Sequence, residues 1–267
     1  MANTVLERAI PKEDPRQAGW AAPAPQTQTL PGGGDVRGPI ARTDAMTIGG
    51  VTSATTVLFI ILMATATYGW SLVDPAPQGQ LEIPVWTWFV AIGGALLAMV
   101  AIFKPPLARF IGPVYAAAQG VFLGAISRAF ENQWDGIVVQ AVLITAIVFG
   151  SMLFLFATRL VRVTDRMRRT IIYATLGLAL FYFVSILISL FGLEMPLIWD
   201  AGPVGILFSV GVCGLAAFNL MLDFDLVDRG IAAGLPKYME WYCGLGLMIS
   251  LVWLYLEVLR LLSKLRQ

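Results

Sequence analysis

The stretch of residues 136–158 reads GIVVQAVLITAIVFGSMLFLFAT and contains no charged side chain. A helix of about 20 residues, rising about 1.5 Å per residue, crosses the ~30 Å hydrocarbon layer of a bilayer. This stretch is long enough and apolar enough to do so. It therefore predicts a membrane-spanning helix.

Further apolar runs of similar length lie on both sides of this stretch. They cover residues 49–72, 83–103, 108–129, 170–193, 204–222 and 238–262. The connections between the runs are short, so consecutive helices are expected to be antiparallel neighbours. The sequence predicts an all-α fold, a polytopic transmembrane bundle of seven helices.

The composition also indicates a membrane protein. Hydrophobic residues make up 58% of the 267 residues and charged residues 13%, and the mean hydropathy is +0.76. A soluble domain usually carries about 25% charged residues. The net charge of +1 gives no field that would attract nucleic acid. We expect a single membrane domain whose surroundings are the lipid bilayer, and no nucleic-acid partner.

Several enzyme classes are excluded because the sequence contains no histidine. Ser/His and Cys/His nucleophile pairs, the usual zinc ligands and an imidazole pH switch all need that residue. The Gly-x-Gly-Asp element of one intramembrane protease class is missing too, because Leu247 follows Gly244-Leu-Gly246. The two cysteines, Cys213 and Cys243, lie in apolar runs and are expected to be buried core residues. We predict a protein that is not an enzyme and that has no cofactor.

Residues 1–45 differ from the rest of the chain because they hold few apolar residues and many helix breakers. These are Pro11, Pro15, Pro23, Pro25, Pro31, Pro39 and the glycines at 32–34. Such a composition is typical of a flexible tail. We expect a cytoplasmic tail, then a transmembrane domain from residue 46 to 267, with the first membrane helix as an uncleaved insertion signal.

The basic residues predict the orientation, because Lys and Arg are enriched in cytoplasmic loops. They gather at alternate connections: Lys104 and Arg109, then Arg159, Arg162, Arg166, Arg168 and Arg169, then Arg229 and Lys237. This pattern predicts a cytoplasmic amino terminus in the plasma membrane. Seven crossings would export Arg260, Lys264 and Arg266, so either the earlier loops overrule these bases or the last segment is re-entrant.

Four acidic residues lie within or at the edge of the predicted spans: Asp223, Asp225, Glu240 and Glu257. A charge near the hydrocarbon is costly unless it is paired, hydrated or neutralised, so these carboxylates are the candidate functional groups. Asn219 shares a helix face with Asp223, whereas Asp225 is turned by about 200° from Asp223. An ordinary ion pair with Arg229 is the alternative interpretation of Asp225.

Glu240 and Glu257 are rival partners for Asp225. They are 17 residues apart, about 25 Å along a helix, so only one of them can lie level with the end of the sixth helix. Two carboxylates within a few ångströms share a proton and form a pH sensor without histidine. The alternative interpretation of Glu257 is an ion pair with Arg260, three residues further along.

At these residues the sequence resembles the transmembrane Bax inhibitor motif family, the Bax inhibitor-1 group, and in particular its bacterial branch with a long amino-terminal tail. The motifs are Phe103-Lys-Pro, Gln119-Gly-Val-Phe-Leu-Gly124-Ala-Ile-Ser, Leu222-Asp-Phe-Asp225-Leu, Pro236-Lys-Tyr-Met-Glu-Trp-Tyr242 and Leu254-Tyr-Leu-Glu257-Val-Leu-Arg-Leu-Leu262. The resemblance covers residues 46–267 and implies a seven-helix bundle with a central last helix.

The resemblance further implies a pH-sensitive calcium leak channel, gated by an acid pair between the sixth and seventh helices. Phe224-Asp225 matches one element of that pair and Leu254-Tyr-Leu-Glu257 the other, although the longer connection between them leaves Glu240 open as the partner. Asp225 is then the candidate for a weak, transient calcium contact. Gln119, at a position often acidic in the family, and Asn219 are the pore-lining candidates. The alternative function is a non-conducting regulator that binds a membrane protease or a stress-response partner.

Overall fold

The computed structural model describes residues 45–74, 84–161, 163–190 and 202–267. The predicted tail, apart from Ala45, lies outside the described residues. Within them, seven long helices account for most of the chain. These are α2 (Ile48–Ser71), α3 (Val85–Phe103), α4 (Ala108–Gln133), α5 (Ile137–Ala157), α6 (Asp165–Leu190), α8 (Pro203–Ala232) and α9 (Met239–Leu265), with a short 3-10 helix η2 (Pro105–Leu107) before α4.

All seven helices are long and apolar enough to cross a membrane. The predicted fold class, an all-α polytopic transmembrane bundle, is confirmed. Apolar side chains cover much of the surface of the outer helices, as expected where the surrounding medium is hydrocarbon.

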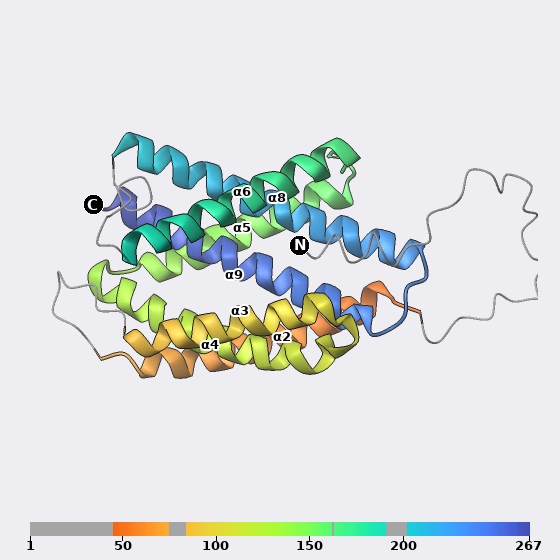
Figure 1. Cartoon of the computed structure of the whole chain (residues 1–267), viewed down its shortest axis with the longest axis horizontal. Helices are drawn as coiled ribbons and strands as arrows, with labels where there is room; N and C mark the ends of the chain where they lie inside the picture. The colour runs from red at the N-terminus through yellow and green to blue at the C-terminus, as the bar shows by residue number, and fades with distance from the viewer. Residues whose placement is uncertain (1–44, 75–83, 162, 191–201) are drawn as a thin grey trace, which may run out of the picture.

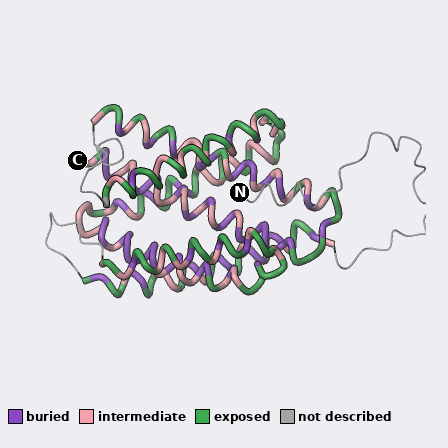
Figure 2. Tube along the Cα trace, in the orientation of Figure 1, coloured by how far each residue is buried: buried purple, intermediate pink, exposed green. Residues whose placement is uncertain are grey.

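Helix α9 runs through the middle of the bundle (Figure 1). It contacts α2 and α4 on one side and α5 and α8 on the other. Figure 2 shows that α9 is buried or half-buried along its length, whereas exposed positions predominate on outer helices such as α3 and α6. The expectation of a central last helix is therefore confirmed.

Helices α2 and α4 approach each other closely because glycines lie at their contact. A Cβ atom on Gly120 would clash with Thr65 and with the backbone of Leu62, and one on Gly124 would clash with the Ala66 carbonyl. Small residues four positions apart permit this kind of close packing between membrane helices. The closely packed α2–α4 pair lies on the opposite side of α9 from α6 (Figure 1).

Helix α8 extends well past the predicted end at residue 222. It continues to Ala232, and Gly234, with a φ of 62°, ends it by letting Leu235 N donate to Gly230 O at 3.0 Å. The apolar run stops earlier, but the Asp225–Arg229 ion pair one turn apart supports the helix beyond it. Both aspartates of interest therefore lie inside a helix and not at its end.

Helix α9 is one uninterrupted helix of 27 residues, which rises about 40 Å and is long enough for a full crossing. The bases at its end contact other parts of the protein. Lys264 Nζ donates to Gly205 O at 3.0 Å, and Arg266 donates to Asp135 O at 2.8 Å and to Gln140 Oε1 at 2.9 Å. The structure favours a full crossing over a re-entrant last segment.

Candidate functional site

Buried and half-buried polar side chains form a seam where α6, α8 and α9 meet. We call this the polar seam, and its members are Arg168, Thr175 and Tyr182 on α6, Asn219, Asp223 and Asp225 on α8, and Ser250 and Glu257 on α9. The α6 members are seven residues apart, as are the α9 members. Seven residues are nearly two helical turns, so each set lies on one face of its helix.

Asp225 lies at one end of the polar seam and binds two arginines. Its Oδ2 accepts from Arg168 of α6 at 2.8 Å and pairs with Arg229 Nε at 2.9 Å. The side chains of Asp225 and Arg168 are only 15% and 9% exposed, so little water screens this interhelical ion pair. The Asp225–Arg229 ion pair, which was the alternative interpretation of Asp225 from the sequence, is present, and the link to α6 is additional.

Asp223 occupies the face of α8 that meets α9. It accepts a hydrogen bond from Ser250 Oγ, and Gly246, one turn earlier on α9, lies opposite its other oxygen. Asn219, one turn away on α8, turns instead toward α6, where its Nδ2 donates to Thr175 Oγ1 at 2.9 Å. The two residues were expected to share a face of α8. Together they join α8 to α6, through Asn219, and to α9, through Asp223.

Glu257 is the centre of a second cluster, near the other end of the seam. Its carboxylate accepts from Arg260 at 3.0 and 3.1 Å, from Tyr182 Oη at 3.1 Å and from Trp253 Nε1 at 3.2 Å. Glu257 is only 3% exposed, so these four bonds replace the water that its charge would otherwise need. The Glu257–Arg260 ion pair, which was the alternative interpretation of Glu257 from the sequence, is part of this cluster.

Glu240 has a different position, away from the polar seam. It is buried at the first turn of α9, and its Oε1 accepts from both N and Oγ1 of Thr47 at 3.0 Å. Thr47 in turn caps α2, because its Oγ1 accepts from Gly50 N at 3.0 Å. Glu240 therefore joins the beginning of α2 to the beginning of α9.

The structure does not bring Asp225 together with Glu257 or with Glu240. Asp225 contacts Arg168 and Glu257 contacts Tyr182, and these two α6 residues are about four turns, or about 20 Å, apart. The carboxylate of Glu240 accepts hydrogen bonds from Thr47, the residue that caps α2. Each acid thus has its own donors, and among the described residues no hydrogen bond joins two of these carboxylates.

Gln119 lies on another side of the bundle. It is buried on α4 against α3, where a Cβ on Gly94 would approach its Nε2 to 2.5 Å. The structure therefore separates the two pore-lining candidates, with Asn219 in the polar seam and Gln119 at the α3–α4 contact. Within the described ranges, no group of three or more Cys, Asp or Glu side chains is arranged to hold a metal ion.

Sequence reasoning missed the partners of the acids. Arg168 was assigned to a basic loop, but α6 begins at Asp165 and carries Arg168 into the bundle. Thr175, Tyr182 and Ser250 looked like isolated polar residues in apolar runs. The seven-residue spacing from Arg168 to Tyr182, matched by Ser250 and Glu257 on α9, is the signal that could have identified a polar face on both helices.

Comparisons with known proteins place the chain in one family. The model of the family described as Bax inhibitor 1 like matches residues 4–267. No curated protein and no solved structure matched the chain.

Proposed function

Because the chain belongs to the Bax inhibitor 1 like family, we propose that it is a pH-sensitive, calcium-permeable leak channel. In this proposal it lies in the plasma membrane with a cytoplasmic amino terminus and catalyses no reaction. Calcium is its cargo and not a resident cofactor. The polar seam is the path, since carboxylate, hydroxyl and amide oxygens are the ligands that calcium prefers.

The observation that carries the proposal is the ion pair between Arg168 of α6 and Asp225 of α8. It joins two helices through a group that can gain a proton. Helix α6 is the least buried of the seven described helices. Among the described residues, Arg168, Thr175 and Tyr182 of α6 make hydrogen bonds to α8 and α9. Weakening one of these contacts therefore affects a large part of what holds α6 in place.

The direction of the pH effect follows from the charges. A deprotonated Asp225 attracts Arg168 and holds α6 against α8, which keeps the seam closed. Protonation removes the negative charge and with it the attraction to both Arg168 and Arg229. Calcium leak therefore increases as the pH falls. An acid pair would act in the opposite sense, because protonation would join its two carboxyls by a hydrogen bond.

Calcium entry into proteoliposomes tests this proposal. We expect the flux carried by the purified protein to rise as the pH falls from about 8 to about 5, because protonation of Asp225 removes its attraction to Arg168. Asp225→Asn should conduct at all of these pH values, because the pair with Arg168 never forms. Asp228→Asn, at an exposed position on the same helix, is the matched control and should keep the pH dependence.

Two results would contradict the proposal, at different levels. If no calcium crosses at any pH, the channel function fails, and a partner that co-purifies in fixed proportion would then support the non-conducting regulator. If calcium crosses but the flux of Asp225→Asn responds to pH as that of the unaltered protein does, the proposed gate at Asp225 is wrong and the leak function is retained.

A further inference from the structure

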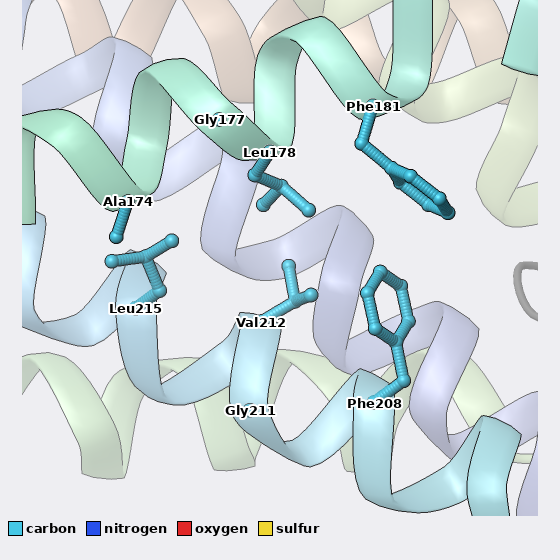
Figure 3. A pocket seen from close by; sticks show the side chains of 8 residues that line it. All are labelled: Ala174, Gly177, Leu178, Phe181, Phe208, Gly211, Val212 and Leu215. Atoms are coloured by element: carbon cyan, nitrogen blue, oxygen red, sulfur yellow. The ribbon is translucent and has the colours of Figure 1, made fainter. Parts of the chain in front are cut away.

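An apolar groove of about 410 Å³ lies between α6 and α8. Figure 3 shows its two walls facing each other across a gap, with side chains of α6 on one wall and of α8 on the other. Its lining consists of Ala174, Gly177, Leu178 and Phe181 on α6 and Phe208, Gly211, Val212 and Leu215 on α8. None of these side chains is polar.

The groove exists because small residues of α6 and α8 face each other between two contacts that join these helices. Gly177 and Gly211 contribute no side-chain volume, and a Cβ added to either would meet no atom within 4 Å. At one end, the rings of Phe181 and Phe208 lie 5.6 Å apart and close the groove. Beyond the other end, Asn219 donates to Thr175 and ties α8 to α6.

The groove is open to the medium around the bundle. Ala174, Gly177 and Gly211 are exposed, and the lining residues belong to two helices that cross the membrane. The lining spans eight residues of each helix, 174–181 and 208–215, and therefore about 10 Å of rise, which is a third of the ~30 Å hydrocarbon layer. The medium that meets the groove is therefore the interior of the bilayer, whose components are acyl chains.

An acyl chain matches this groove in chemistry and in shape. Water gains no hydrogen bond from an all-apolar lining, so water does not fill such a space. A flexible hydrocarbon chain follows an irregular wall and gains dispersion contacts with both helices. We propose that the groove between α6 and α8 is a binding site for one acyl chain of a membrane phospholipid. The site lies beside the polar seam and is independent of whether the seam conducts calcium.

Photo-crosslinking in proteoliposomes tests the site. The probe is phosphatidylcholine with a diazirine in the middle of one acyl chain, diluted into unlabelled phosphatidylcholine. A bound chain should label peptides containing residues 174–181 and 208–215 in a manner that saturates as the probe fraction rises. Ordinary contact with the bilayer, as at the exposed side chains Phe89, Ile92 and Leu96 of α3, should rise in proportion to the probe.

Groove-filling variants supply the decisive comparison. Gly177→Leu and Gly211→Leu should abolish the saturable labelling, and the Cβ atom added at either position would meet no atom within 4 Å. Gly150→Leu on α5 is the matched control, since Gly150 is also exposed in a membrane helix with no atom within 4 Å of an added Cβ. It should leave the labelling intact.

A variant that enlarges the groove keeps the proposal testable if the filled variants fail to fold. Leu178→Ala removes a side chain from the lining and should retain or increase the saturable labelling. Labelling that never saturates in the unaltered protein overturns the site, as does labelling that survives in folded Gly177→Leu and Gly211→Leu. Calcium flux is not the readout, so a failed leak assay leaves this result unaffected.

Discussion

Arg168 on α6 donates a hydrogen bond to Asp225 on α8 over 2.8 Å, and this ion pair joins the least buried membrane helix to the core of the bundle. Arg229 on α8 shares the same carboxylate oxygen at 2.9 Å. The two arginines differ in what their loss would do, because one bridges two helices and the other lies on the same helix as the aspartate.

Asp225→Asn should destabilise the protein more than Arg168→Gln does. Without the carboxylate, Asp165 is the one acid among the described residues that still pairs with the buried Arg168, and its side chain is 3.8 Å away and largely exposed. An uncompensated buried charge of this kind costs about 3 kcal/mol. After Arg168→Gln, Arg229 still neutralises Asp225, and the expected cost is about 1 kcal/mol. Thermal unfolding in detergent measures the loss of stability of both variants. Equal losses would contradict the conclusion that Arg168 is a buried charge that depends on Asp225.

Glu257→Gln should be more damaging than Tyr182→Phe. The glutamate contacts Arg260, Tyr182 and Trp253 at once, and its charge compensates the arginine in a buried site, so its removal is expected to cost about 3 kcal/mol. Tyr182→Phe removes only hydrogen bonds of the hydroxyl and should cost about 1 kcal/mol. The same unfolding assay applies, and a larger loss for Tyr182→Phe would show that the hydroxyl, and not the carboxylate, organises the cluster.

Gly124→Ala should impair folding, whereas Gly93→Ala should be tolerated. The new methyl group at Gly124 would overlap backbone atoms of Ala66 and Trp70, which cannot rotate away, and overpacking of this kind costs about 1–3 kcal/mol or more. At Gly93 an added Cβ meets no atom within 4 Å. The yield of monodisperse protein on size-exclusion chromatography compares the two, and normal yield of Gly124→Ala would mean that α2 and α4 are less tightly packed.

The carboxy terminus should lie on the opposite side of the membrane from the amino terminus. Seven crossings place the two termini on opposite sides. Lys264 and Arg266, whose charges would otherwise oppose export, donate hydrogen bonds to backbone carbonyl groups of the protein. A cysteine placed at Gln267, in a protein with Cys213→Ala and Cys243→Ala, should react with a membrane-impermeant maleimide added outside intact cells. A cysteine placed at Ala2 should react only after the cells are opened. The reverse pattern would invert the predicted orientation.

Much of the fold follows from the sequence because the length of an apolar run and the thickness of a bilayer are directly comparable. The seven runs and the ion pairs of Asp225 with Arg229 and of Glu257 with Arg260 are features of single helices. Each of the two ion pairs joins residues one turn apart on one helix, so helical periodicity alone indicates it.

Only the tertiary structure decided which helices are joined by ion pairs and hydrogen bonds of the acidic side chains. The sequence favoured a pair between Asp225 and a glutamate of the last helix. In the structure, the register of α6, α8 and α9 places Asp225 against Arg168. Glu257 bonds instead to Tyr182 and Arg260. Interhelical register depends on the packing of all side chains between the helices, which no local pattern encodes. For the same reason, the groove between Gly177 and Gly211 became visible only when α6 was placed against α8.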